Sequence, residues 1–362
     1  MSESSIVVIG AGLSGLHAAW RLQAAGRAVL LLEARERAGG RILSLPGAEA
    51  ATHQLDLGPS WYWPELNPLL SAWVQRLGLS SYPQHSEGAG LFEGPDGSLR
   101  RLGQSWEQAP RSMRIAGGMA ALVAGMQALL SDVDYRPGTV VEGLQLRPEG
   151  GVELLLRQGE RRDVQPAAGV ISTLPPRLLA ELPAQPAWPP EQMQAWRRTP
   201  TWMAGQAKFV AVYERAFWRE AGLSGAAMSQ RGPMAEIHDA SSASGEAAAL
   251  FGFVGLPAAH RQSMGAEALR QQALAQLVRL FGPQAGRPLR IALQDWASEP
   301  YTAHALDHAP LGHHPSYAPG RVPADWQGRL WLAGTEFAPQ SGGYLEGALE
   351  AAEAAQAAAQ QA

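Results

Sequence analysis

Residues 6–15 read IVVIGAGLSG, and this stretch decides the fold of the N-terminal part of the chain. The apolar, β-branched run Ile6–Ile9 is typical of a buried parallel strand. After the glycines, a helical spacing of apolar residues continues to about Ala25. A second apolar run, 28–32, closes the unit and ends at Glu33. The stretch therefore predicts a β-α-β unit of the Rossmann-like α/β class.

The spacing of the glycines has a chemical reason. Gly10 permits the tight turn, Gly12 lets the backbone approach a pyrophosphate, and Gly15 lets helix and strand pack closely. The helix N-terminus, which includes Ser14, offers unpaired N–H groups to phosphates. Glu33 can accept hydrogen bonds from both hydroxyls of an adenosine ribose. The pattern predicts dinucleotide binding, against the alternative of a glycine-rich turn in an ordinary loop.

The motif continues past the second strand as EARERAGGR, residues 33–41. Gly39 and Gly40 give a second turn that permits close approach, and Arg41 adds a charge suited to a diphosphate. This sequence resembles the flavin-binding signature of the flavin monoamine oxidase family, within the amine oxidase and phytoene desaturase superfamily. The resemblance implies FAD rather than NAD. It also implies a Rossmann-like FAD-binding domain of a GR2-type flavoprotein with an inserted α+β substrate-binding domain.

The composition limits the kinds of protein this can be. A chain of 362 residues can bury a sizeable core and suggests two domains. Its 29 Lys and Arg nearly balance 33 Asp and Glu, which argues against nucleic acid or an anionic membrane as a partner. Without cysteine, it can form no disulfide, thiolate metal site or cysteinyl flavin link. No apolar run approaches the ~20 residues that span a bilayer, and no basic region opens the chain. We expect a cytoplasmic monomer or homodimer without a signal peptide or membrane contact.

Periodicity and turn residues predict the other elements. The expected elements are helices over 66–79 and 267–281, a hairpin over 90–103, strands over 139–146, 152–156, 169–176 (ending in a proline turn), 206–213 and 328–336, and a helix from 341 to the C-terminus. The resemblance implies a discontinuous FAD-binding domain formed by 1–58, 112–178 and 320–362. The substrate-binding domain is then formed by 59–111 and 179–319.

Lys208 is the only lysine among the 29 cationic side chains. The alternation over 206–213 places Lys208, Val210 and Val212 on one strand face, and a lysine on an apolar face loses hydration unless it has a partner. Residues 208–218 resemble the family segment whose lysine holds a water molecule against flavin N5, which makes Lys208 a candidate catalytic residue. The alternative is a surface lysine on an edge strand.

Two further catalytic candidates come from the resemblance. Trp296 lies in a stretch similar to the family segment that leads toward the flavin, and Tyr344 matches the second ring of an aromatic cage at the substrate. The family position of a covalently bound cysteine is Ala305, which implies non-covalent FAD. The first cage ring is replaced by Leu306, so the cage lacks one side or is rebuilt from another side chain such as Trp296 or Trp61.

The other expected cofactor positions also come from the resemblance. Pro59 stands where the family has the second glycine, after Gly58, and as a proline it has no backbone N–H to donate to the cofactor. The complete set of expected cofactor-binding residues is Gly10, Gly12, Ser14, Gly15, Glu33, Ala34, Arg35, Gly39, Gly40, Arg41, Gly58, Pro59, Ser60, Trp61, Val140, Thr173, Trp296, Gly334, Thr335, Glu336, Gly343 and Tyr344.

Four histidines, His304, His308, His313 and His314, are close in sequence. Such a group could bind a metal. The alternative is a polar loop over the flavin edge, with one histidine touching the substrate. Since the implied chemistry needs no metal, we expect no metal site.

The resemblance implies an FAD-dependent amine oxidase. Hydride passes from the amine Cα to flavin N5, the imine is hydrolysed to a carbonyl product, and O2 reoxidises the flavin to give H2O2. Two alternatives stay open: a flavin-dependent desaturase or dehydrogenase that acts on C–C bonds or uses another acceptor, and a flavin-binding protein without turnover.

Overall fold

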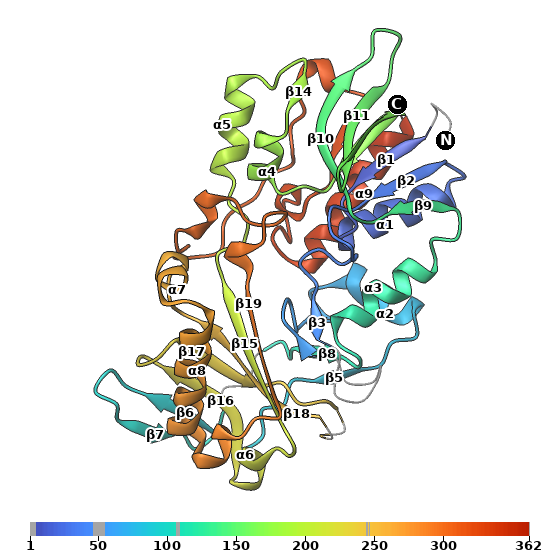
Figure 1. Ribbon diagram of the computed structural model, residues 1–362. Helices are drawn as coiled ribbons and strands as arrows, with labels where there is room; N and C mark the ends of the chain where they lie inside the picture. Colours follow the sequence, from blue (N-terminus) through green and yellow to red (C-terminus); the bar gives the residue numbers. More distant parts are fainter. Residues whose placement is uncertain (1–4, 46–54, 106–108, 244, 246, 362) are drawn as a thin grey trace.

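The protein is described by a computed structural model that covers residues 5–45, 55–105, 109–243, 245 and 247–361. A five-stranded parallel sheet has the order β20-β13-β1-β2-β9 (Figure 1). Its strands are β1 (Ile6–Ile9), β2 (Val29–Leu32), β9 (Val133–Arg136), β13 (Gly169–Ser172) and β20 (Leu330–Leu332). The expected β-α-β unit is confirmed, with α1 (Leu13–Ala24) between β1 and β2.

Helices cover one face of the parallel sheet. Ile6 and Val8 of β1 pack into a core shared with α1, α2 (Pro68–Arg76), α3 (Met119–Ala128) and α9 (Leu345–Gln361). Their neighbours Val7 and Ile9 point to the opposite face. Both faces of β1 are therefore buried, as its uninterrupted apolar run predicts.

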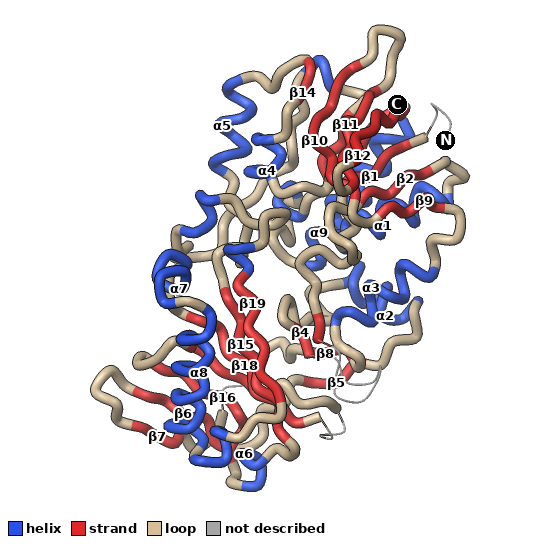
Figure 2. The backbone as a smooth tube through the Cα atoms, in the orientation of Figure 1, coloured by secondary structure: helices blue, strands red, loops and turns tan. Residues whose placement is uncertain are grey.

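A smaller sheet covers the opposite face (Figure 2). Its order is β12-β11-β10-β14, and Leu144, Val152 and Leu154 from β10 and β11 pack against Val7 and Ile9. The strands are β10 (Thr139–Leu146), β11 (Val152–Gln158), β12 (Arg161–Ala167) and β14 (Ala184–Gln185). Helices α4 (Pro176–Glu181) and α5 (Pro190–Arg198) follow in the chain. The layers are thus helices, the parallel sheet and a mixed four-stranded sheet.

A seven-stranded sheet forms the second lobe, which lies at the lower end of Figure 1. Its order is β19-β15-β18-β17-β16-β6-β7. The strands are β6 (Ala89–Glu93), β7 (Leu99–Arg101), β15 (Ala207–Tyr213), β16 (Leu223–Ser229), β17 (Met234–Asp239), β18 (Ala248–Val254) and β19 (Arg290–Asp295). The hairpin expected over 90–103 is confirmed as β6 and β7.

Helix α8 (Ala266–Phe281) packs on one face of this sheet. Phe209 and Tyr213 of β15 share a core with Leu277 of α8, whereas Val210 belongs to a core on the other face. The predicted alternation is therefore confirmed, and Lys208 lies on the face away from α8.

The remaining elements are short. They are α6 (Phe217–Glu220), α7 (Ala258–Met264), β3 (Ser44–Leu45), β4 (Leu55–Asp56), β5 (Ser81–Pro83), β8 (Met113–Ile115), and 3-10 turns at Pro283–Gly286, Trp296–Ser298, Ala305–His308, Ala324–Trp326 and Thr335–Phe337. No helix in the described part of the chain is long and apolar enough to cross a membrane. The division into domains at 58, 112, 178 and 320 stays a prediction.

Candidate active site

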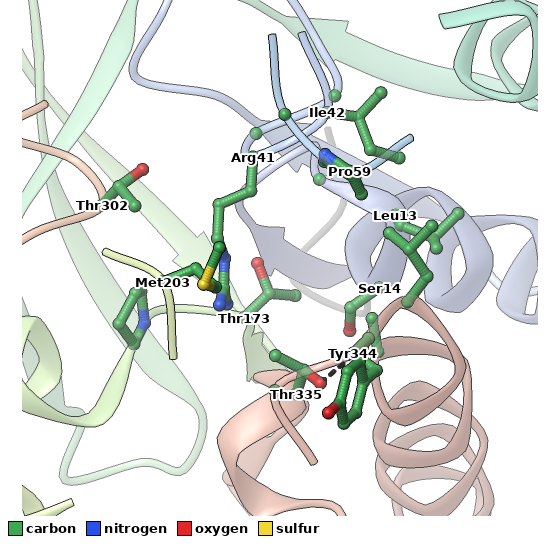
Figure 3. A pocket seen from close by; sticks show the side chains of 18 of the residues that line it. Leu13, Ser14, Arg41, Ile42, Pro59, Thr173, Met203, Thr302, Thr335 and Tyr344 are labelled. Atoms are coloured by element: carbon green, nitrogen blue, oxygen red, sulfur yellow. Dashed lines mark hydrogen bonds between the residues drawn. The ribbon is translucent and has the colours of Figure 1, made fainter. Parts of the chain in front are cut away.

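A cavity of about 810 Å³ opens at the carboxyl ends of β1 and β2. This volume lies within the ~300–1,000 Å³ range of small-molecule sites, and the crevice beyond the strand ends is where open α/β sheets bind ligands. Figure 3 shows that Ser14, Thr173 and Tyr344, which are far apart in sequence, surround a common space. The predicted site residues in its lining are Gly10, Gly12, Ser14, Glu33, Ala34, Arg35, Gly39, Gly40, Arg41, Gly58, Pro59, Ser60, Trp61, Val140, Thr173, Lys208, Trp296, Thr335, Gly343 and Tyr344.

Three predicted cofactor residues lie behind this lining. A Cβ atom at Gly15 would lie 1.8 Å from the carbonyl oxygen of Gly10, so the absent side chain lets α1 pack on the loop. Gly334 lies two residues before the buried Glu336, whose carboxylate accepts hydrogen bonds from Arg41 at 2.7 and 3.2 Å. Glu336 therefore orients a guanidinium of the lining.

The loop after β1 leaves space and backbone donors beside the cavity. The N-cap of α1 is Gly12, which provides no side-chain cap to the first N–H groups of the helix. A Cβ atom at Gly12 would meet only the Cα of Gly40 within 4 Å. An uncapped helix N-terminus beside such an opening suits a diphosphate.

Glu33 ends β2 and is almost fully buried, with 4% of its surface exposed. Its Oε2 accepts a hydrogen bond from the Ala11 N–H and its Oε1 accepts one from the Arg35 N–H, both at 2.9 Å. These bonds fix the carboxylate in the lining while lone pairs on both oxygens stay available to ribose hydroxyls.

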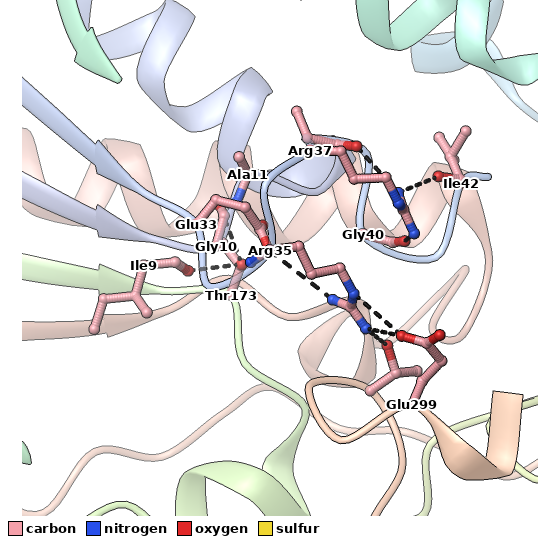
Figure 4. A network of polar contacts seen from close by, with 12 residues as sticks. Ile9, Gly10, Ala11, Glu33, Arg35, Arg37, Gly40, Ile42, Thr173 and Glu299 are labelled. Carbon is pink, nitrogen blue, oxygen red and sulfur yellow. Dashed lines mark hydrogen bonds and ion pairs between the residues drawn. The ribbon is translucent and has the colours of Figure 1, made fainter. Parts of the chain in front are cut away.

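Arg35, which follows β2 of the parallel sheet, binds the segment that follows β19 of the seven-stranded sheet (Figure 4). Its Nη2 donates to Glu299 Oε2 at 2.9 Å and to Thr302 Oγ1 at 3.0 Å. Its guanidinium also lies 5.5 Å from the ring centroid of Tyr301. The segment after β19 is thereby held against the β2 end of the cavity, a contact that sequence patterns did not predict.

Lys208 is buried in the cavity wall, with 3% of its surface exposed. Its Nζ donates to Ser60 Oγ at 2.6 Å and to the Gly58 carbonyl at 3.0 Å, and lies 4.0 Å from the ring centroid of Phe251. Burial lowers the pKa of Lys208 from its ordinary value of 10.5 to about 7, while the charge of Asp56 opposes the shift. The amine can therefore gain or lose a proton near neutral pH.

Trp296 fixes the same turn from the other side. Its Nε1 donates to the Leu57 carbonyl at 3.0 Å, next to the Gly58 carbonyl that accepts from Lys208. Pro59, which follows, has no N–H to donate. The carbonyl groups of this turn thus bind protein side chains, and the lining at Ser60 and Trp61 is held in place.

The cage position at Leu306 is not part of the cavity lining. Ala305 and Leu306 belong to the 3-10 turn Ala305–His308, and Leu306 is 50% exposed. Tyr344 does line the cavity. The rings of Trp61, Trp202 and Phe253 line it too, so aromatic walls come from several segments rather than from position 306.

Three of the four histidines make separate contacts, and His313 is exposed. His304 Nδ1 accepts from the Leu306 N–H at 3.1 Å, and His308 Nε2 lies 3.0 Å from the Ala297 carbonyl oxygen. His314 stacks on Tyr344. Among the described residues, no three His, Cys, Asp or Glu side chains are grouped so as to hold a metal.

Sequence patterns missed several lining residues. Trp202, Met203 and Phe253 belong to segments that showed no site motif, and Trp63 follows the expected turn at 58–61 without being singled out as a site residue. Met203 has a φ of +64°, a conformation that non-glycine residues seldom adopt and that clusters at functional sites. Its strain is a property of the folded backbone and has no marker in the sequence.

The carboxylates in the described lining are those of Glu33 and Glu346. Glu346 is 2% exposed and accepts hydrogen bonds from the Leu69 and Leu70 N–H groups, at 2.8 and 3.0 Å. Both carboxylates are therefore bound to backbone donors, one at the end of β2 and the other at the first turn of α2.

Comparisons with known proteins agree with this geometry. The family described as flavin containing amine oxidoreductase matches residues 92–359, and an NAD(P)-binding Rossmann-like domain matches residues 8–77. A probable flavin-containing monoamine oxidase A from Dictyostelium discoideum is 24% identical over 95% of both chains. A putrescine oxidase from Kocuria rosea is 26% identical over 96% of this chain and 93% of its own.

Solved structures share the fold. A cyclohexylamine oxidase from Brevibacterium oxydans IH-35A superposes with a TM-score of 0.79 at 21% identity, over 99% of both chains. A putrescine oxidase bound to putrescine superposes with a TM-score of 0.78 at 22% identity, over 98% of both chains.

Proposed function

Because the chain belongs to the flavin containing amine oxidoreductase family, we propose that it oxidises monoamines with an apolar substituent and uses O2 as electron acceptor. The enzyme is a flavin-dependent oxidoreductase that acts on amine donors, with FAD as its cofactor. The uncapped start of α1, the open space at Gly12 and the fixed carboxylate of Glu33 fit a dinucleotide of this kind.

The observation that carries the proposal is the position of Lys208 in the aromatic-lined cavity. Its buried ammonium group is held by Ser60 and Gly58 beside Trp296 and the ring of Phe251. Because burial brings its pKa to about 7, Lys208 can hold a proton at Nζ or release it during turnover.

The reaction balances as follows. FAD supplies the two-electron acceptor for the α C–H bond of the amine. A primary amine, O2 and water give an aldehyde or ketone, ammonia and H2O2, with an imine as the product that water hydrolyses. The aromatic walls exclude water and favour the neutral form of the amine, because desolvation lowers the pKa of an ammonium group. Glu33, Arg35, Arg41 and the start of α1 would hold FAD, without a covalent link at Ala305.

The preference for monoamines follows from the two lining carboxylates. Glu33 would bind the ribose of FAD, and Glu346 is 2% exposed and already accepts hydrogen bonds from the Leu69 and Leu70 N–H groups. The second ammonium of a diamine would be desolvated without a free carboxylate to bind it. A matched pair tests this: we expect kcat/KM for n-hexylamine to exceed that for 1,6-diaminohexane by at least about tenfold, equivalent to ~1.4 kcal/mol. Equal values, or a preference for the diamine, would refute the monoamine assignment.

Stopped-flow absorbance tests the electron acceptor. We expect n-hexylamine to bleach the flavin anaerobically, and air to restore the colour rapidly with release of H2O2. Bleaching followed by recovery over minutes would identify a dehydrogenase with another acceptor. Failure of an amine panel to bleach the flavin would reject amine oxidation for this chain. The cytoplasmic location and the monomeric or homodimeric state stay predictions.

A further inference from the structure

The rings of His314 and Tyr344 form a parallel stack. Their centroids are 4.7 Å apart and their planes differ by 7°. Tyr344 lines the cavity and directly precedes α9, whereas His314 belongs to the irregular segment after the 3-10 turn Ala305–His308. The stack therefore joins a cavity ring to a segment that is remote in sequence.

Further aromatic contacts hold His314 in place. Trp202 packs on it edge-on with centroids 4.9 Å apart, and Tyr317 does so at 5.8 Å. The Tyr317 hydroxyl accepts a hydrogen bond from the Trp202 N–H at 3.1 Å and donates one to the Pro200 carbonyl at 2.9 Å. These contacts join the cavity residues Trp202 and Tyr344 through His314.

Gly343 shows how closely this group packs. Its φ is +82°, and a Cβ atom there would lie 3.0 Å from Trp202 Cβ and 3.1 Å from His314 Nε2. Only glycine fits both the conformation and the space. The backbone at Gly343, just before α9, therefore packs directly against His314 and Trp202. The same residue also lines the cavity.

Tyr344 needs such support. It is 45% exposed, and its hydroxyl has no hydrogen bond to the described residues, so ring contacts hold its side chain. We propose that His314 is a positioning residue for substrate specificity. Its imidazole fixes the ring of Tyr344 so that Tyr344 and Trp202 form one wall, which receives the apolar substituent of the amine. The inference rests on the proposed function for the identity of the ligand, but the stack itself can be tested without turnover.

The kinetic test separates binding from chemistry. With benzylamine, we expect His314→Ala to raise KM by about 3- to 10-fold, the worth of one aromatic pair, and to leave kcat within about twofold. His314→Phe should keep KM within about twofold, because Phe preserves a stacking ring and the buried Nε2 of His314 has no hydrogen-bond partner to lose. His313→Ala is the matched control, since His313 is the exposed neighbour. An unchanged KM in His314→Ala, or equal effects of Ala and Phe, would overturn the proposal.

The structural test uses protein labelled with 3-fluorotyrosine. The 19F resonance of Tyr344, assigned with Tyr344→Phe among the seven tyrosines, should shift and change width in His314→Ala. It should not do so in His313→Ala. An unaltered resonance in His314→Ala would overturn the stack. If no amine is oxidised but the resonance responds as expected, the proposed function fails and the positioning of Tyr344 by His314 stands.

Discussion

Lys208 donates a hydrogen bond from its Nζ to Ser60 Oγ across 2.6 Å, and thereby joins β15 of one lobe to the turn that follows β4. The bond connects residues separated by 148 positions. Because Ser60 and Lys208 both line the cavity, the same contact orients the amine of the chain's only lysine toward the proposed reaction site.

Lys208→Met should slow the aerobic recovery of flavin absorbance by about tenfold or more, because it removes a fixed charge and proton donor. Anaerobic reduction by benzylamine should change much less. Rapid mixing of the reduced enzyme with air-saturated buffer measures the first rate. Ser60→Ala is the control that keeps the ammonium group but removes one of its acceptors. Equal slowing of both half-reactions by Lys208→Met would contradict a specific role with O2.

Lys208 should also make stability depend on pH. Its pKa is about 7 in the folded protein and 10.5 as its ordinary value, so between these pH values the unfolded chain binds more protons. Stability then rises with pH through this window, by at most ~1.4 kcal/mol per pH unit for this group. Below pH 7 the cost of the buried charge is fully present.

Urea unfolding at pH 7, 8 and 9 measures this effect as a difference between two proteins. The free energy of unfolding of the wild type should increase relative to that of Lys208→Met over this series. Parallel curves for the two proteins would show that Lys208 has an ordinary pKa in the folded state.

Glu299→Gln should weaken retention of FAD, because it removes the charge that binds Arg35 at the cavity edge. If losing this partly exposed charged hydrogen bond weakens FAD binding by ~1 kcal/mol, the Kd for FAD rises about fivefold. Recovery of flavin fluorescence on dilution measures the release. Glu267→Gln is the matched control, since Glu267 forms an exposed pair with Arg270 on α8. Identical release from both variants would leave the Arg35–Glu299 bond without a role in retention.

Gly343→Ala should destabilise the protein more than Gly26→Ala. Both glycines have positive φ, +82° and +71°, but a Cβ atom at Gly26 meets nothing within 4 Å. Gly26→Ala therefore measures the backbone cost of ~1 kcal/mol, and crowding against Trp202 and His314 should add ~1–3 kcal/mol in Gly343→Ala. Equal losses of unfolding free energy in urea would show that Trp202 and His314 can move to accommodate the added methyl group.

The local sequence predicted much of the fold because the determining patterns are short. The β-branched run Ile6–Ile9 and the following glycines predicted β1 and α1, and strict alternation over 206–213 predicted the buried face of Lys208. The turn residues Pro95, Asp96 and Gly97, which lie between the two expected strands, predicted the β6–β7 hairpin. Each of these depends on neighbours within a few residues, where backbone geometry fixes which side chains share a face.

The sequence also identified which residue types could bind a dinucleotide. Glu33 at the end of the second strand and the paired glycines before Arg41 carry that information without reference to the rest of the chain. Their placement in one cavity follows from the parallel order of β1 and β2, which directs both carboxyl ends to the same edge.

Only the tertiary structure decided the contacts between distant segments. No pattern indicated that Glu299 would bind Arg35, that Leu306 would lie outside the cavity, or that His314 would stack on Tyr344. These contacts form where irregular segments pack, and there the neighbours of a side chain depend on the folded path of the whole loop. The sequence thus determined the cofactor half of the site through local backbone geometry, whereas packing between remote segments decided the substrate wall.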